Sequence, residues 1–150
     1  MYNGSADWQK IADVVAATEL PVLANGDIRN LVDVTAAMAR SGARGVMIGR
    51  GAQGRPWLLA QAGDLLADRA VRPDPNITCR HQLMKLHLED MLSHYGNNAI
   101  RLARKHIAWY AIGLPGAAKL RDIANNSTNA AAVFAAVDSF FTHLGTCEVA

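Results

Sequence analysis

Residues 21–51 read PVLANGDIRNLVDVTAAMARSGARGVMIGRG. Two short apolar runs, at residues 21–24 and 45–48, each lead into a glycine-containing loop, and a helical pattern lies between them. Short runs that are almost fully apolar predict buried strands, and two such strands joined by a helix predict a parallel β-α-β unit. This stretch therefore places the first part of the chain in the α/β class.

Helical patterns flank this unit on both sides. Asp7 or Ser5 can cap a helix before it, and Asn30 can cap the helix within it. Pro56 suits the first position of a third helix. Two buried parallel strands alone leave both sheet edges unpaired and cannot be covered on both faces. We therefore expect residues 1–72 to be the end of something larger: either the chain is a fragment, or it borrows strands from a partner.

A rigid, polar segment at residues 72–76, RPDPN, separates this region from a purely helical one. Beyond it, apolar residues recur at helical spacing over four segments with short connections. The first ends at Gly96, the next two span 98–112 and 117–124, and a last one follows a polar cap. We expect an all-α helical bundle over residues 76–145.

The composition excludes several classes of protein. The chain has 150 residues, of which 51% are hydrophobic and 19% charged, so disorder is a poor interpretation. No apolar run is long enough to span a bilayer, and no signal peptide is evident. The two cysteines, Cys79 and Cys147, lie far apart, and the spacing of His81, His87 and His94 is not that of metal ligands. We expect a cytoplasmic protein without a metal site or a membrane partner.

Two loops after the predicted strands form the first candidate site. They are Asn25-Gly26-Asp27 and Gly49-Arg50-Gly51, and in consecutive units of a parallel barrel such loops emerge side by side. Glycine lets backbone N–H groups approach a phosphate, and the Arg50 guanidinium can donate several hydrogen bonds to it. Glycine also serves simply to turn a chain from strand to helix, so the residues alone leave both interpretations open.

The second candidate site lies on the helix predicted at 98–112. Residues 76–125 carry seven basic and three acidic groups, for a net charge of +4. Cations at positions i, i+3 and i+4 share one helix face, and neighbouring aromatic rings suit stacking on RNA bases. The residues concerned are Arg101, Arg104, Lys105, His106, Trp109 and Tyr110. The alternative is a solvated basic face with aromatic residues in the core, and the spacing does not decide between the two.

Together these segments resemble the C-terminal part of the tRNA-dihydrouridine synthases, in particular their bacterial nitrogen-regulation-like branch. In chain order the matching segments are MYNGSADW (1–8), PV (21–22), NGDI (25–28), GVMIGRGA (45–52), PW (56–57), RKH (104–106), WY (109–110), GLPG (113–116) and Arg121. The resemblance implies an FMN enzyme built as a TIM-type (α/β)8 barrel, followed by a helical tRNA-binding domain. Such enzymes reduce the C5–C6 double bond of uridines in tRNA, with NADPH recharging the flavin.

The resemblance also assigns roles to residues. It implies that residues 1–72 are the FMN-binding barrel remnant with its last two βα units, and that residues 76–145 bind tRNA. It places five residues around the FMN phosphate and ribityl chain: Asn25, Gly26, Asp27, Gly49 and Arg50. The loop with Tyr2 and Asn3 corresponds to the end of the sixth barrel strand, near flavin and substrate.

One departure from the family pattern concerns catalysis. In the family, a cysteine in the first half of the barrel delivers a proton to C5 of the uracil, and neither Cys79 nor Cys147 matches it. We therefore expect no catalytic residue in this chain, which would be inactive without the N-terminal barrel half of the same protein. Two alternatives stay open: a non-catalytic RNA-binding module, or the tail of another FMN- or phosphate-binding barrel enzyme with a nucleotide or keto-acid substrate.

Overall fold

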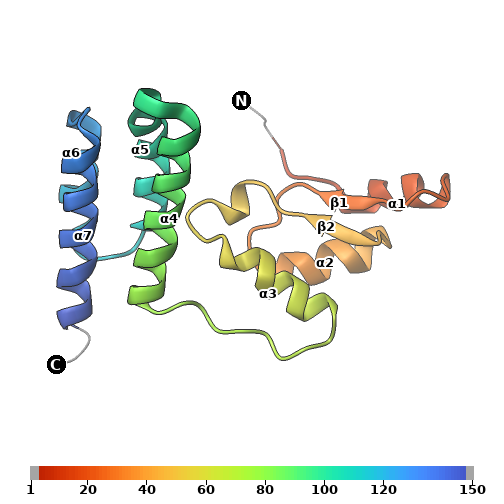
Figure 1. Cartoon of the computed structure of the whole chain (residues 1–150). Helices are drawn as coiled ribbons and strands as arrows, with labels where there is room; N and C mark the ends of the chain where they lie inside the picture. Colours follow the sequence, from red (N-terminus) through yellow and green to blue (C-terminus); the bar gives the residue numbers. More distant parts are fainter. Residues whose placement is uncertain (1–3, 148–150) are drawn as a thin grey trace. The chain divides into compact units, whose positions relative to one another are not determined.

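The computed structural model describes residues 4–147, apart from the side chains of Asn97, Thr146 and Cys147. The chain divides into two compact units, Met1–Pro73 and Asp74–Ala150. The first combines helices with a small parallel sheet, and the second is helical throughout its described part (Figure 1). The predicted α/β class is confirmed, whereas the (α/β)8 barrel and the bundle stay predictions. Tyr2 and Asn3 lie outside the described residues.

The first unit follows the predicted order of elements. It contains α1 (Trp8–Ala16), β1 (Leu23–Asn25), α2 (Leu31–Ser41), β2 (Gly45–Met47), the short 3-10 helix η1 (Arg50–Ala52) and α3 (Trp57–Leu66). The two strands pair in parallel, with Ala24 opposite Val46, as the alternation of apolar runs and helix predicted. Helices α1 and α2 pack against the strands, and α3 packs against α2.

Local chemistry explains where these helices begin and end. The Asp7 side chain accepts a hydrogen bond from the backbone N–H of Gln9 and caps α1. The Asn30 side chain caps α2 in the same way, and Gly42, in the left-handed conformation, ends that helix. Both caps on Asp7 and Asn30 agree with the sequence analysis. Pro56 lies one position earlier than predicted, at the N-cap of α3.

The prediction that both strands are buried is wrong. Ala24 is fully buried, but its neighbour Leu23 is 58% exposed, and Met47 on β2 is 55% exposed. Side chains alternate between the two faces of a strand, and one face packs on the helices around Ala24, Ile28 and Val34. The other face has no covering layer among the described residues of this unit, so its large apolar side chains stay exposed.

The described part of the second unit, residues 74–147, consists of four α-helices and one short turn of 3-10 helix. They are α4 (Ile77–Tyr95), the 3-10 helix η2 (Gly96–Asn98), α5 (Ala99–Tyr110), α6 (Ala117–Asn126) and α7 (Ala130–Cys147). Helix α4 packs against α5 and α7, and α6 packs against the same two helices (Figure 1). The structure confirms the predicted helices, and most of the helix ends lie within about two residues of the predicted ones.

The core of the second unit is built from apolar residues that recur at helical spacing. Met84, Ile107 and Phe141 are almost completely buried, and on α7 both Val133 and Val137 are buried as well. This core needs no sheet to complete it. Within the described part of the chain, no helix is both long and apolar enough to cross a membrane.

Candidate functional site

The two strand-end loops meet at one open cavity of about 750 Å³. Its lining contains all five residues predicted to bind a cofactor, namely Asn25, Gly26, Asp27, Gly49 and Arg50. Five further residues complete it: Ile28, Arg29, Met47, Gly51 and Arg55. The parallel pairing of β1 with β2 explains this meeting, because the carboxyl ends of parallel strands lie at the same edge of the sheet.

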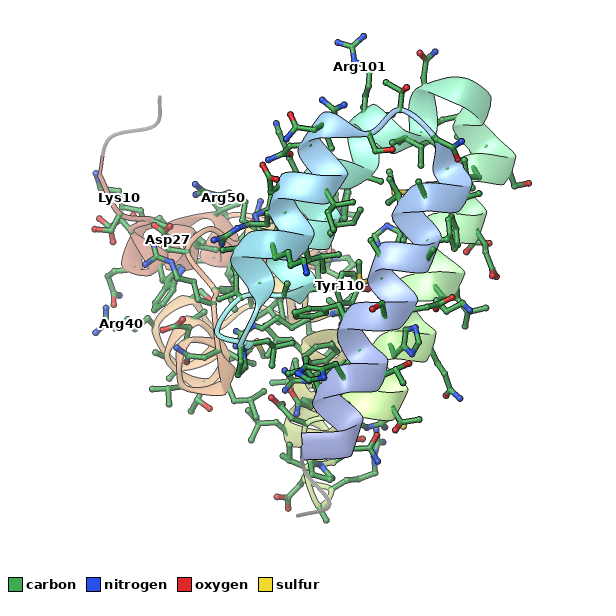
Figure 2. All side chains as sticks on the ribbon, turned by 90° about the vertical axis from the view of Figure 1, so that its left-hand side faces the viewer. Lys10, Asp27, Arg40, Arg50, Arg101 and Tyr110 are labelled. Carbon is green, nitrogen blue, oxygen red and sulfur yellow. The ribbon has the colours of Figure 1, made fainter. Side chains whose placement is uncertain are left out.

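The charge of the lining favours an anionic ligand. Three arginines and one aspartate line the cavity, which gives it a positive balance. The Arg50 and Arg29 side chains are 78% and 74% exposed, so both guanidinium groups are accessible to a ligand. Arg50 lies near the Asp27 carboxylate, at a nitrogen–oxygen distance of 3.6 Å (Figure 2). The corresponding distance from Arg29 to Asp27 is 3.2 Å. A phosphate could accept hydrogen bonds from such groups.

Asp27 ties the loops of the site together. Its carboxylate accepts a hydrogen bond from the backbone N–H of Ala6 at 2.8 Å, in addition to the contacts with Arg29 and Arg50. The hydrogen bond from Ala6, followed by the arginine contacts, holds the pKa of Asp27 below its ordinary value, so the group is ionised at neutral pH. An ionised carboxylate repels phosphate, and its contacts here orient the arginines and the loop around Ala6.

Two structural features favour glycine at position 26, in addition to the close approach of a phosphate. Its backbone φ is +107°, and an added Cβ would lie 2.6 Å from the Cβ of Ala6. The indole Nε1 of Trp8 also donates a hydrogen bond to the Gly26 carbonyl at 2.9 Å. In the sequence Trp8 stands out only as part of the matching segment at residues 1–8, and no local pattern predicts this hydrogen bond across 18 residues.

Arg55 bridges the two loops and was missed by the sequence analysis. Its guanidinium donates to the carbonyl of Arg29 through Nη2 and to the carbonyl of Gly51 through Nε. An added Cβ at Gly51 would overlap the carbonyl oxygen of Ile28, so the loops can pack this closely only with glycine there. The sequence signal that could have indicated the role of Arg55 was its position directly before Pro56, the N-cap residue of α3.

The basic residues of α5 do not form one solvated face. The exposed side chain of Arg101 projects away from the helices (Figure 2). Lys105 is exposed as well. Arg104 is half-buried, and its Nη2 donates to the carbonyl of Ser127 at 3.3 Å, in the connection between α6 and α7. The Nε of Arg104 is buried and has no hydrogen-bond partner in the described part of the chain. The i, i+3, i+4 pattern is present, but its middle member points toward the protein.

The aromatic residues near this helix are partly committed to the core. Tyr110 is 4% exposed, and its hydroxyl lies 3.5 Å from Nδ1 of His87. The rings of His87 and His106 meet edge to face, with 4.6 Å between their centroids. The rings of Trp109 and His106 have the same arrangement, with 5.1 Å between their centroids. Burial, followed by the nearby His87, lowers the pKa of His106, so this imidazole is neutral at pH 7.

Burial likewise raises the pKa of Tyr110. The alternative that places aromatic residues in the core therefore holds for Tyr110, whereas His106 and Trp109 are half-buried.

No group of three or more histidine, cysteine or acidic side chains that could hold a metal occurs among the residues described.

Comparisons with known proteins assign the chain to a family. The model of the dihydrouridine synthase family matches residues 1–144. The chain is 39% identical over 142 residues to a probable tRNA-dihydrouridine synthase of Rickettsia bellii, and 44% identical over 142 residues to one of Rhodobacter capsulatus. It is 38% identical over 144 residues to tRNA-dihydrouridine synthase B of Xanthomonas axonopodis pv. citri.

These matches cover 94–95% of this chain but only 43–44% of the relatives, so the chain spans less than half of their length. A family match over nearly the whole chain, at this level of identity, leaves one conclusion. The chain belongs to the dihydrouridine synthase family.

Proposed function

We propose that this chain is the C-terminal portion of an FMN-dependent enzyme that reduces uridine to 5,6-dihydrouridine in tRNA, with NADPH as the electron donor. The names of the relatives support the reaction, and their greater length supports a larger whole. The exposed face of the sheet, with Leu23 and Met47, supports further barrel strands that would cover it. In this proposal residues 1–72 complete the barrel, and residues 76–145 bind tRNA.

The observation that carries the cofactor assignment is the cavity at the two strand-end loops. It combines accessible arginines with glycine backbone, and both features suit a phosphate group. Arg50 and Arg29 would hold the FMN phosphate, and Asn25 and Gly49 would border it. Asp27 would act indirectly, by orienting Arg50 and by holding the loop at Ala6.

The chemistry of the reduction would reside in the flavin, which supplies a hydride when it is bound. The residues of this chain would bind and orient. Arg50 would balance the charge of the phosphate, and Trp8 would keep the Gly26 carbonyl in place. We assign no catalytic residue to this chain, because the resemblance places the proton-donating cysteine elsewhere and Cys79 lies on the helical unit.

For tRNA, the exposed cations of α5 are the best candidates for contacts with phosphates. Arg101 and Lys105 are accessible, and the half-buried Trp109 and His106 lie on the same helix. Arg104 and Tyr110 also belong to the predicted RNA site, but their side chains have contacts within the protein. They would hold α5 in place rather than contact tRNA. Binding through phosphates releases counterions and therefore weakens as salt is added.

The test is an activity assay on unmodified tRNA. The longest natural protein that contains this chain is incubated with FMN and NADPH, and dihydrouridine is counted by mass spectrometry. We expect turnover with that protein and none with the 150-residue chain alone. Turnover by the chain alone would contradict its proposed dependence on the rest of the barrel. Binding of tRNA by the longer protein without turnover or flavin would favour a non-catalytic RNA-binding module instead.

A further inference from the structure

A buried acidic residue lies near the end of α3, outside both candidate sites. Asp64 is 4% exposed, and it is one of three buried polar or charged residues in the described part of the chain. The other two are Gln61 and Ser41. A buried carboxylate requires charged or hydrogen-bonding partners to offset its desolvation. Asp64 and Gln61 both find their partners in the segment that follows α3.

Arg72 provides most of these partners. Its Nε and Nη2 donate to the two carboxylate oxygens of Asp64 at 2.6 and 2.9 Å, a bidentate arrangement. The backbone N–H of Arg72 also donates to Asp64, and its backbone carbonyl accepts a hydrogen bond from Gln61. Arg69 adds a second guanidinium at 3.1 Å. The hydrogen bonds from Arg72 hold the pKa of Asp64 far below its usual range, so this anchor stays charged.

A second anchor lies on the other side of the boundary between the units. Arg80, in α4, donates through Nε to the carbonyl of Pro75 at 3.1 Å, and its Nη2 lies 3.4 Å from the carboxylate of Asp74. Asn76 caps the same helix through its side chain. The chain from Asp74 onward is therefore held on the second unit, as Arg72 is held on the first.

Pro73 alone separates these two anchored residues. The ring of a proline fixes its own φ, and it also restricts the residue before it. Pro73 and Pro75 thus limit Arg72 and Asp74 in addition to themselves. The side-chain contacts at both ends leave few backbone bonds about which the connection can turn.

We propose that the anchors at Asp64 and Arg80 stiffen the connection between the two units and act as positioning residues for the reaction on tRNA. This inference rests on the proposed function, in which one unit binds the flavin and the other binds tRNA. A stiff connection limits the orientations that a bound tRNA can adopt. It thereby favours those in which the target uridine reaches the flavin.

The first test measures the stiffness directly and needs neither tRNA nor flavin. Spin labels are introduced through a keto-bearing amino acid at Ala39 and Glu89, exposed positions on α2 and α4, in the longest natural protein that contains this chain. We expect the distribution of label–label distances to widen in Asp64→Asn. Arg72→Gln removes the same interaction from the exposed side and serves if Asp64→Asn fails to fold. Asp68→Asn, an exposed acidic position in the same loop, is the matched control and leaves the distribution unchanged.

The second test measures the consequence for the reaction. We expect kcat/KM for tRNA to fall by about tenfold or more in Asp64→Asn and Arg72→Gln. In these variants the bound tRNA would adopt more orientations, and fewer of them would place the target uridine at the flavin. NADPH oxidation without tRNA should stay unchanged, as should the flavin content. Distance distributions of equal width in the variants and the wild type would overturn the proposal. So would wider distributions with unaltered kinetics on tRNA. If the wild-type protein makes no dihydrouridine, the proposed function fails, and the label distances still decide whether the anchors stiffen the connection.

Discussion

At the scale of single residues, the site depends on contacts that cross long stretches of sequence. The predicted residues Asn25, Gly26, Asp27, Gly49 and Arg50 all line one cavity. Their proximity was predictable, because parallel strands end at a common edge. The bonds from Ala6 to Asp27 and from Trp8 to Gly26 were not predictable, because they depend on how the start of α1 approaches the loop.

Asp27 allows a test of this arrangement by substitution. Asp27→Asn removes the charge that orients Arg29 and Arg50, so we expect weaker FMN binding and a lower midpoint of thermal unfolding. In the longest natural protein that contains this chain, FMN affinity is measured by titration with the flavin, and the unfolding midpoint by circular dichroism. Asp13→Asn, an exposed acidic position on α1, is the matched control and should leave both quantities unchanged. An unaltered FMN affinity in Asp27→Asn would contradict the orienting role.

The same carboxylate predicts a dependence of stability on pH. The folded structure lowers the pKa of Asp27. Its stabilising contribution is therefore complete above the unfolded pKa of about 3.9, and it is lost as the pH falls through the folded value. The difference in stability between the wild type and Asp27→Asn should shrink as the pH falls below about 4. A difference that stays constant down to strongly acidic pH would show that the ionised form is not what stabilises the loops.

At the scale of secondary-structure elements, the helices were largely predictable and the strands only in part. Caps at Asp7 and Asn30, and helix ends at Gly42 and Gly96, act through neighbouring residues, so the local sequence contains the signal. Strand burial is different, because it depends on what covers each face. Leu23 shows this, since an apolar side chain in an apolar run is exposed where no layer packs on it.

Helix α5 carries the test of RNA binding. We expect Arg101→Ala and Lys105→Ala each to weaken tRNA binding and to reduce the log–log salt slope by about 0.7–0.9 for each phosphate that the protein no longer neutralises. Arg104→Ala should instead lower the thermal midpoint, because the residue is half-buried and bonded to the carbonyl of Ser127. Affinity is measured by titration at several salt concentrations, beside a circular-dichroism melt for each variant.

Lys119→Ala on α6, an exposed cation on another helix, is the control for a general decrease in positive charge. If Arg101→Ala and Lys105→Ala bind tRNA with the affinity and salt slope of the wild type, this helix face is merely solvated. If Arg104→Ala lowers the salt slope without lowering the melt, the assignment of Arg104 to a supporting role is wrong.

At the scale of the whole molecule, the order of predicted helices and strands indicated the division of the chain better than any one motif did. A β-α-β unit followed by four helices predicts two regions of different architecture, and the chain divides into two units at residues 73 and 74. The sequence could not predict the anchors beside this point, because Asp64, Arg72 and Arg80 become partners only when the segment after α3 folds back. Nor does an exposed sheet face identify its covering, which is inferred here from the greater length of the relatives.

In the proposed function, the two strand-end loops hold the phosphate of FMN. The most direct test is to compare the binding of FMN with that of riboflavin, which lacks the phosphate, in the longest natural protein that contains this chain. We expect the wild type to prefer FMN, and Arg50→Ala to weaken FMN binding by about tenfold to a hundredfold without changing riboflavin binding. Arg44→Ala, an exposed arginine outside the cavity, should keep the full preference. If Arg50→Ala keeps it as well, or weakens both flavins equally, these loops do not bind the phosphate through Arg50 as proposed.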